Sequence, residues 1–69
     1  QFEVLNQRTV GSGHLKLRLR LDDRILEAIW FNRTEPLAGS ARLAYRLQSQ
    51  EYRGRTELQL QIEDEVTDE

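Results

Sequence analysis

Alternation of apolar and polar residues with a period of two is the dominant pattern along this chain. It is clearest in HLKLRLRL, residues 14–21, where Leu fills every second position and His14, Lys16, Arg18 and Arg20 fill the others. A period of two is that of a β-strand, whose successive side chains point to opposite faces. This stretch therefore predicts a strand with one apolar face and one basic face.

The same pattern predicts four further strands, over residues 2–10, 25–31, 41–47 and 56–63. Residues typical of turns and loops separate them: Gly11-Ser12-Gly13, either a tight turn or a bulge in one long strand, Asp22-Asp23-Arg24, the segment 32–40 with Pro36 and Gly39, and a polar connection over 48–55. Helical spacing of apolar residues is not found. The chain is thus expected to be all-β, with about five antiparallel strands.

Five antiparallel strands in 69 residues cannot remain an open sheet without exposing their apolar face. We therefore expect a small barrel, and the five-stranded Greek-key type known as the OB-fold has the right size and strand count. An SH3-like barrel is the alternative, because periodicity predicts that strands exist but does not give their order.

The alternation also predicts which apolar side chains point inward. Phe2 and Tyr45 are expected in the core. Trp30 and Phe31 point to opposite faces, and we expect Phe31 in the core and Trp30 partly exposed. The remaining inward positions of the last two strands are Leu43, Leu47, Leu58, Leu60 and Ile62.

Charge is unevenly distributed along the chain. Ten Lys and Arg against twelve Asp and Glu give a net charge of -2, but all ten basic residues lie between Arg8 and Arg55 with only five acids among them, a local charge of +5. The C-terminal end is acidic. We expect residues 1–64 to form the domain and residues 65–69 to be an acidic disordered tail or a linker.

Composition excludes several function classes. The absence of Cys removes disulfides and thiolate chemistry, a lone His14 cannot build a His-based metal site, and no apolar run is long enough to span a bilayer. No acid is placed to orient His14 near a nucleophile, so we expect no enzyme activity and no cofactor in this segment. The domain is expected to be a cytoplasmic monomer without membrane contact. Because the chain begins at Gln1 and contains no Met, we expect it to be a piece of a longer protein.

The basic face is the candidate site. In a strand, each of Lys16, Arg18 and Arg20 lies about 7 Å from the next, which is close to the spacing of nucleotides in an extended single strand. Basic clustering together with exposed aromatic rings favours single-stranded nucleic acid as the ligand, provided that no carboxylates neutralise the cluster. The residues expected to extend the site are Arg46, Arg53, Arg55, Tyr52 and Trp30.

Three ordered blocks also carry a family resemblance: GSGHLKL at 11–17, AIWFN at 28–32, and AYRL, EYRGR and LQL between 44 and 60. They resemble the C-terminal OB-fold domain of bacterial RecJ, the single-stranded-DNA-specific exonuclease. The resemblance implies a module that guides single-stranded DNA toward DHH-type catalytic domains, absent here, which hold Mn or Mg and degrade DNA 5′ to 3′ in recombination and mismatch repair. It extends a DNA-contact role to the charged and exposed residues of the matching blocks.

A second interpretation remains open beside DNA binding. A basic groove also suits carboxylates, so the domain could dock its own nuclease domains or an acidic peptide such as the tail of a single-strand binding protein. A purely scaffolding role without any ligand is the third possibility.

Overall fold

The computed structural model describes residues 1–66, apart from the side chains of Gln50 and Tyr52. This part of the chain contains strands and no helix, and therefore no helix that could cross a membrane. The strands are β1 (Phe2–Val10), β2 (His14–Leu21), β3 (Arg24–Trp30), β4 (Ser40–Ala41), β5 (Leu43–Tyr52) and β6 (Arg55–Glu65). β6 runs through Glu65, and the division of the chain after residue 64 stays a prediction.

The Gly11-Ser12-Gly13 segment is the turn between β1 and β2, since Val10 is paired with His14. Gly11 and Gly13 have φ values of 57° and 120°, a region that glycine adopts with little strain. The bulge lies elsewhere in β1, between Val4 and Asn6. Of the two alternatives that the sequence left open for this segment, the turn is therefore the one observed.

The hairpin of β5 and β6 is longer than the pattern predicted. Residues 48–55, expected to be a polar connection, are almost entirely strand, because Tyr52 pairs with Arg55 and leaves only Arg53 and Gly54 in the turn. Both turn residues have positive φ, 50° and 77°, as in the type I′ turns that join antiparallel strands. The expected loop was wrong because polar residues also occur in a strand whose two faces meet solvent.

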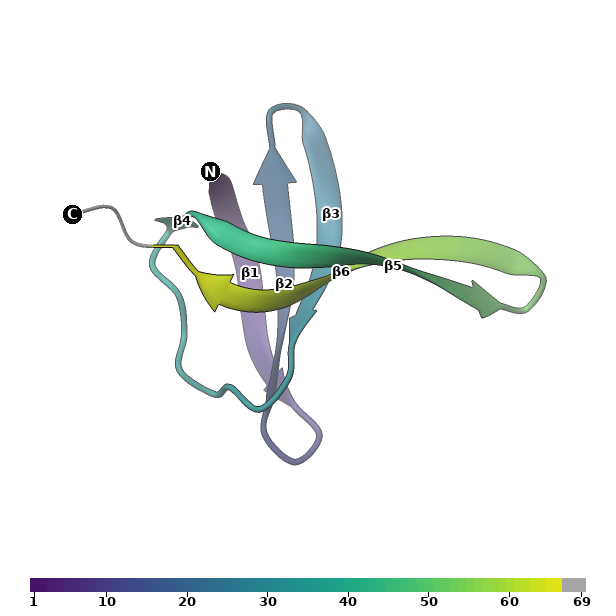
Figure 1. The fold of residues 1–69 in the computed structure, drawn as a ribbon, viewed down its shortest axis with the longest axis horizontal. Helices are drawn as coiled ribbons and strands as arrows, with labels where there is room; N and C mark the ends of the chain where they lie inside the picture. Colours follow the sequence, from purple (N-terminus) through teal and green to yellow (C-terminus); the bar gives the residue numbers. More distant parts are fainter. Residues whose placement is uncertain (67–69) are drawn as a thin grey trace.

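The six strands form one curled sheet in the order β4-β1-β2-β3-β6-β5, antiparallel except for the pair β3 and β6. β1, β2 and β3 run side by side, and the β5–β6 hairpin crosses in front of them (Figure 1). β4 and β5, at opposite ends of this order, are separated in the chain only by Arg42, so the sheet curls back toward its first edge. This topology is that of the expected OB-type Greek-key barrel rather than the SH3-like alternative, with the two-residue β4 as a sixth strand.

The core lies between the β1–β2–β3 layer and the hairpin. Leu37, from the connection 31–39, is buried in it, and the Gln7 side chain fixes this connection by accepting from Leu37 N at 2.7 Å and donating to Leu37 O at 2.9 Å. The buried residues are Phe2, Leu15, Leu17, Leu19, Ala28, Leu37, Ala41, Leu43, Leu60 and Ile62.

Two of the expected core rings are not in the core. Phe31 is 42% exposed and Tyr45 is 47% exposed, although the Tyr45 ring packs edge-on against the buried Phe2 ring at a centroid distance of 5.5 Å. Phe31 follows the last residue of β3 and keeps the outward parity of its strand. Both side chains therefore lie at borders of the barrel, which the alternation of the sequence does not reveal.

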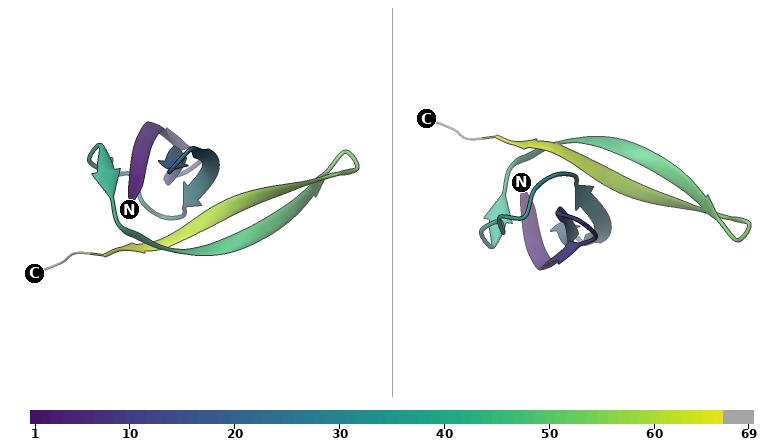
Figure 2. Two further views of the ribbon diagram at one scale, coloured as in Figure 1. Left: turned by 90° about the horizontal axis from the view of Figure 1, so that it is seen from above. Right: turned by 90° about the horizontal axis from the view of Figure 1, so that it is seen from below.

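The molecule is elongated because the hairpin is longer than the barrel is wide. Its extents are 44 × 31 × 19 Å, and both views of Figure 2 show the tip of the β5–β6 hairpin well beyond the other strands. Leu47 and Leu58 belong to the inward face of this hairpin, as expected, but are 58% and 61% exposed. Their strands continue past the end of the core, so nothing in the described chain covers them.

Candidate nucleic-acid interface

The outer face of β1, β2 and β3 carries the predicted basic strand. Because side chains alternate, outward residues that are paired across the strands form rows on this face. The rows are Glu3–Arg20–Ile25, Asn6–Arg18–Glu27 and Arg8–Lys16–Ile29, followed by Val10 and His14. Lys16, Arg18 and Arg20 therefore do share one face, with a fourth basic residue, Arg8, beside them.

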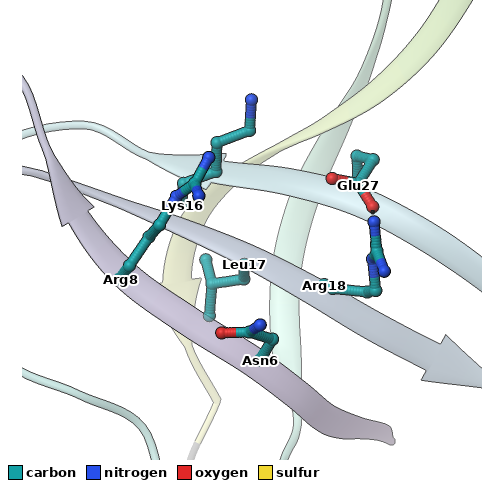
Figure 3. Close-up of a pocket in the computed structure, with 6 residues that line it drawn as sticks. All are labelled: Asn6, Arg8, Lys16, Leu17, Arg18 and Glu27. Atoms are coloured by element: carbon teal, nitrogen blue, oxygen red, sulfur yellow. Dashed lines mark hydrogen bonds and ion pairs between the residues drawn. The ribbon is translucent and has the colours of Figure 1, made fainter.

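Arg8 and Lys16 form a like-charged pair across β1 and β2. They are directly opposite in the register, and Figure 3 shows their side chains rising next to each other from the sheet. Within residues 1–66, neither side chain has an ion pair or a hydrogen bond. Like charges placed opposite each other in a sheet are destabilising, so this pair favours an anion above it.

Arg18 and Arg20 were expected to be cations that no carboxylate neutralises, but each is paired with a carboxylate. Arg18 Nε is 3.0 Å from Glu27 Oε2, and Arg20 Nη2 is 2.7 Å from Glu3 Oε1. The expectation of three unneutralised cations was therefore wrong for two of them. These exposed pairs are worth only about 0–1 kcal/mol each, so a phosphate can replace either carboxylate at little cost.

The outer face also has an exposed aromatic ring next to the like-charged pair. Phe31 packs edge-on against His14, with ring centroids 5.2 Å apart, and His14 Nδ1 accepts a hydrogen bond from Asn32 N at 3.0 Å. His14 is two residues from Lys16 on the same strand face, a distance of about 7 Å. A base stacked on Phe31 would thus place a neighbouring phosphate close to Lys16 and Arg8.

We name this surface, made of Arg8, His14, Lys16, Arg18, Arg20 and Phe31, the β1–β2 cationic face. Pairing in the first hairpin could have revealed Arg8, since a three-residue turn at Gly11–Gly13 places residue 8 opposite residue 16. Phe31 was missed because both faces of the strand predicted over 25–31 are largely apolar, so alternation did not show which of them is buried. Asn6 and Glu27 lie at one border of the cationic face, beside Arg18 (Figure 3).

The other predicted site residues lie elsewhere. Arg46 is on the outward side of the hairpin, 3.3 Å from Glu63, on the opposite wall of the barrel. Arg53 and Arg55 are at the hairpin tip, where Arg55 is 3.7 Å from Glu57. The Tyr52 side chain lies outside the part of the chain that the structure describes.

Trp30 is half-buried, as expected, but points to the inner side of β3. It packs against the core, and the Arg33 guanidinium covers its ring with Cζ 4.0 Å from the ring centroid. Arg33 Nη2 is also 3.8 Å from Glu65 Oε1, and this ion pair helps to keep the guanidinium over the Trp30 ring. Trp30 is thus separated from Lys16 by the sheet itself, and its role in DNA contact stays a prediction.

The described outer face offers cationic side chains and an exposed ring, which are groups suited to binding. Residues 1–66 contain no group of three or more His, Cys, Asp or Glu placed to hold a metal ion. The hollow bordered by Arg8, Lys16 and Arg18 is partly open to solvent and lined mainly by polar atoms. Such a surface suits an extended polyanion better than a small substrate that must be enclosed.

Comparisons with known proteins agree with the OB-type fold. A family model described as RecJ OB domain matches residues 1–64. The curated protein named "Single-stranded-DNA-specific exonuclease RecJ" from Haemophilus influenzae is 35% identical over an alignment 72 positions long, which covers 91% of this chain but 12% of that protein. The chain therefore spans a small part of the length of this relative. No solved structure matches the chain significantly.

Proposed function

This chain belongs to the RecJ OB-domain family, and we propose that it is a single-stranded-DNA-binding module of a RecJ-like exonuclease. In this proposal the β1–β2 cationic face holds the strand and guides it toward catalytic domains that are not in this sequence. The observation that carries the proposal is the Arg8–Lys16 pair, which has no ion partner within residues 1–66, beside the exposed Phe31 ring.

Electrostatics and stacking both support a single strand as the ligand. A phosphate near Arg8 and Lys16 relieves the repulsion between them and releases counterions from the DNA. A ring such as Phe31 contributes roughly 1–3 kcal/mol per stacked base, but only if the base is free to leave a duplex stack. We therefore expect binding to single strands to exceed binding to a duplex of equal length.

The test is a titration of labelled single-stranded oligonucleotide followed by fluorescence anisotropy at several salt concentrations. We expect affinity to fall with salt by a log–log slope of about -0.7 per phosphate contacted. The double variant Arg8→Gln/Lys16→Gln removes two contacts and should reduce the magnitude of the slope by about 1.4. Phe31→Leu should weaken binding by about tenfold and leave the slope unchanged.

Arg46→Gln is the matched control, because it removes one exposed positive charge from the opposite wall of the barrel. It should change the affinity much less than Lys16→Gln does. Equal effects of the two substitutions would refute the assignment of the cationic face, and would return Arg46 to the site. Affinity that ignores both salt and the double variant would refute DNA binding itself.

The wider context is part of the same proposal. The parent protein would be a cytoplasmic DHH-type 5′–3′ exonuclease that uses Mn or Mg in its catalytic domains and acts in DNA repair and recombination, including mismatch repair. An acidic peptide, such as the tail of a single-strand binding protein, could compete for Arg8 and Lys16, since carboxylates and phosphates need the same donors. Displacement of labelled DNA by such a peptide would measure this competition.

A further inference from the structure

A second surface of the molecule is apolar, and it adjoins the border of the β1–β2 cationic face at Glu27 alone. It is a groove between the overhanging hairpin and the end of the β2–β3 pair, on the inner side of the sheet. Leu47 and Leu58 form its outer part and Leu60 its floor. The residues that line it are Leu21, Arg24, Leu26, Glu27, Tyr45, Leu47, Leu58 and Leu60, and we name it the hairpin groove.

The groove exists because β3 and β6 are hydrogen-bonded over only a short stretch. They are paired only at Ala28–Leu60 and Ile29–Gln61, so β3 before residue 28 and β6 before residue 60 diverge. The apolar alternation of the core continues into this gap through Leu26 and Leu58. In the described chain, the connection 31–39 covers the core with Leu37 near Gln7, and no corresponding segment covers the hairpin groove.

Charge and composition separate this groove from the DNA-binding surface. Its two charged border residues, Arg24 and Glu27, are of opposite sign, and its other lining residues are Leu and Tyr. A polyanion gains nothing there, whereas apolar side chains would bury Leu47 and Leu58. The occupant must therefore be an apolar protein segment.

We propose that the hairpin groove receives apolar side chains from the catalytic portion of the polypeptide that carries this domain. The matching segment is 12% of the Haemophilus influenzae RecJ chain, so a protein of this kind has a large body of polypeptide beside the domain. The hairpin, standing away from the barrel, acts as the arm that fixes the domain's orientation on that body. This inference rests on the proposed function in one respect, namely that the parent is a RecJ-like exonuclease.

The test compares thiol accessibility in the isolated chain and in a full-length chimera. In the chimera, this chain replaces the matching segment of Haemophilus influenzae RecJ. Because the chain has no native Cys, single Leu58→Cys and Ile25→Cys variants report on one site each, by mass-spectrometric mapping of alkylated peptides. The two positions are matched in exposure: Leu58, in the groove, is 61% exposed, and Ile25, on the outer face, is 60% exposed.

We expect the Leu58→Cys thiol to react at least about tenfold more slowly in the chimera than in the isolated chain, while the Ile25→Cys thiol reacts at a similar rate in both. Equal rates at residue 58 in the two proteins would overturn the inference. Protection of residue 58 in the isolated chain that rises with protein concentration would also overturn it, because a second copy would then occupy the groove. Protection by added single-stranded DNA would overturn it in favour of the nucleic acid.

Anisotropy titrations on the same chimera distinguish this inference from the proposed function. Protection of residue 58 together with DNA binding that the Arg8→Gln/Lys16→Gln variant leaves unchanged would leave the groove assignment standing and refute the DNA-binding proposal. DNA binding that depends on Arg8 and Lys16 without protection of residue 58 would do the reverse.

Discussion

Arg18 and Glu27 show how a single carboxylate can set the strength of a binding surface. Their ion pair is 3.0 Å long, with side chains 58% and 45% exposed. A pair this exposed adds little to folding, but Glu27 lowers the positive potential where a phosphate would approach. Glu27 thus lies at the border of the cationic face and competes with the ligand for Arg18.

The Glu27→Gln variant should therefore bind single-stranded DNA about two- to fivefold more tightly, because Arg18 no longer shares its charge with a carboxylate. Stability should fall by at most about 1 kcal/mol, as is typical of exposed pairs. Anisotropy titration at low salt measures the first effect, and urea unfolding the second.

Glu63→Gln is the control for overall charge, since it makes the same change beside Arg46 on the opposite wall. Screening should limit its effect on affinity to less than about twofold. An equal gain from both variants would mean that net charge alone, and not the position of Glu27, governs binding.

At the scale of elements, the turns decide how the strands are joined, and glycine is required at only some of them. Gly13, between β1 and β2, has a φ of 120°, whereas Gly39 has an ordinary φ and no atom within 4 Å of an added Cβ. The nearest atom to an added Cβ at Gly13 is Thr34 Cγ2 at 3.7 Å, so there is space for a methyl group. The obstacle at Gly13 is the backbone conformation itself.

Gly13→Ala should therefore destabilise the domain by about 1–3 kcal/mol, the usual cost of holding an L-residue in such a conformation. Gly39→Ala should be within about 0.5 kcal/mol of neutral or slightly stabilising, because it reduces the freedom of the unfolded chain. Urea unfolding followed by circular dichroism measures both. Equal losses would show that the β1–β2 turn adopts another conformation in solution.

The elements were largely predictable from the sequence. Alternation placed the strands over 2–10 and 14–21 correctly, because a strand with one buried face must repeat with period two. It failed for residues 48–55, where both strand faces meet solvent and no apolar repeat is needed. The two-residue β4 has too few residues to show any period.

At the scale of the whole molecule, a small core supports a long hairpin. A 69-residue domain is expected to have a stability of roughly 3–10 kcal/mol, so one large core side chain is a substantial share. Leu19 is fully buried in this core, whereas Leu58 is 61% exposed on the overhang. A Leu→Ala substitution at each of these two positions therefore compares how much the core and the overhanging hairpin contribute to the free energy of unfolding.

Leu19→Ala should cost about 2–5 kcal/mol and leave the domain partly unfolded at room temperature. Leu58→Ala should cost less than about 1 kcal/mol, since little of its surface is buried in this chain. Thermal and urea unfolding of the isolated chain measure both values. A large loss for Leu58→Ala would show that the hairpin groove is already filled in solution.

The sequence by itself determined the local features of this protein: strands with one apolar face, a basic face on β2, and the ordered blocks of the RecJ OB domain. These follow from the spacing of side chains along one strand and need no knowledge of neighbours. The tertiary structure decided which charges meet. Strand register brought Arg8 to Lys16 and Glu27 to Arg18, and the length of the hairpin relative to the barrel exposed Leu47 and Leu58, because pairing and overhang depend on residues far apart in the chain.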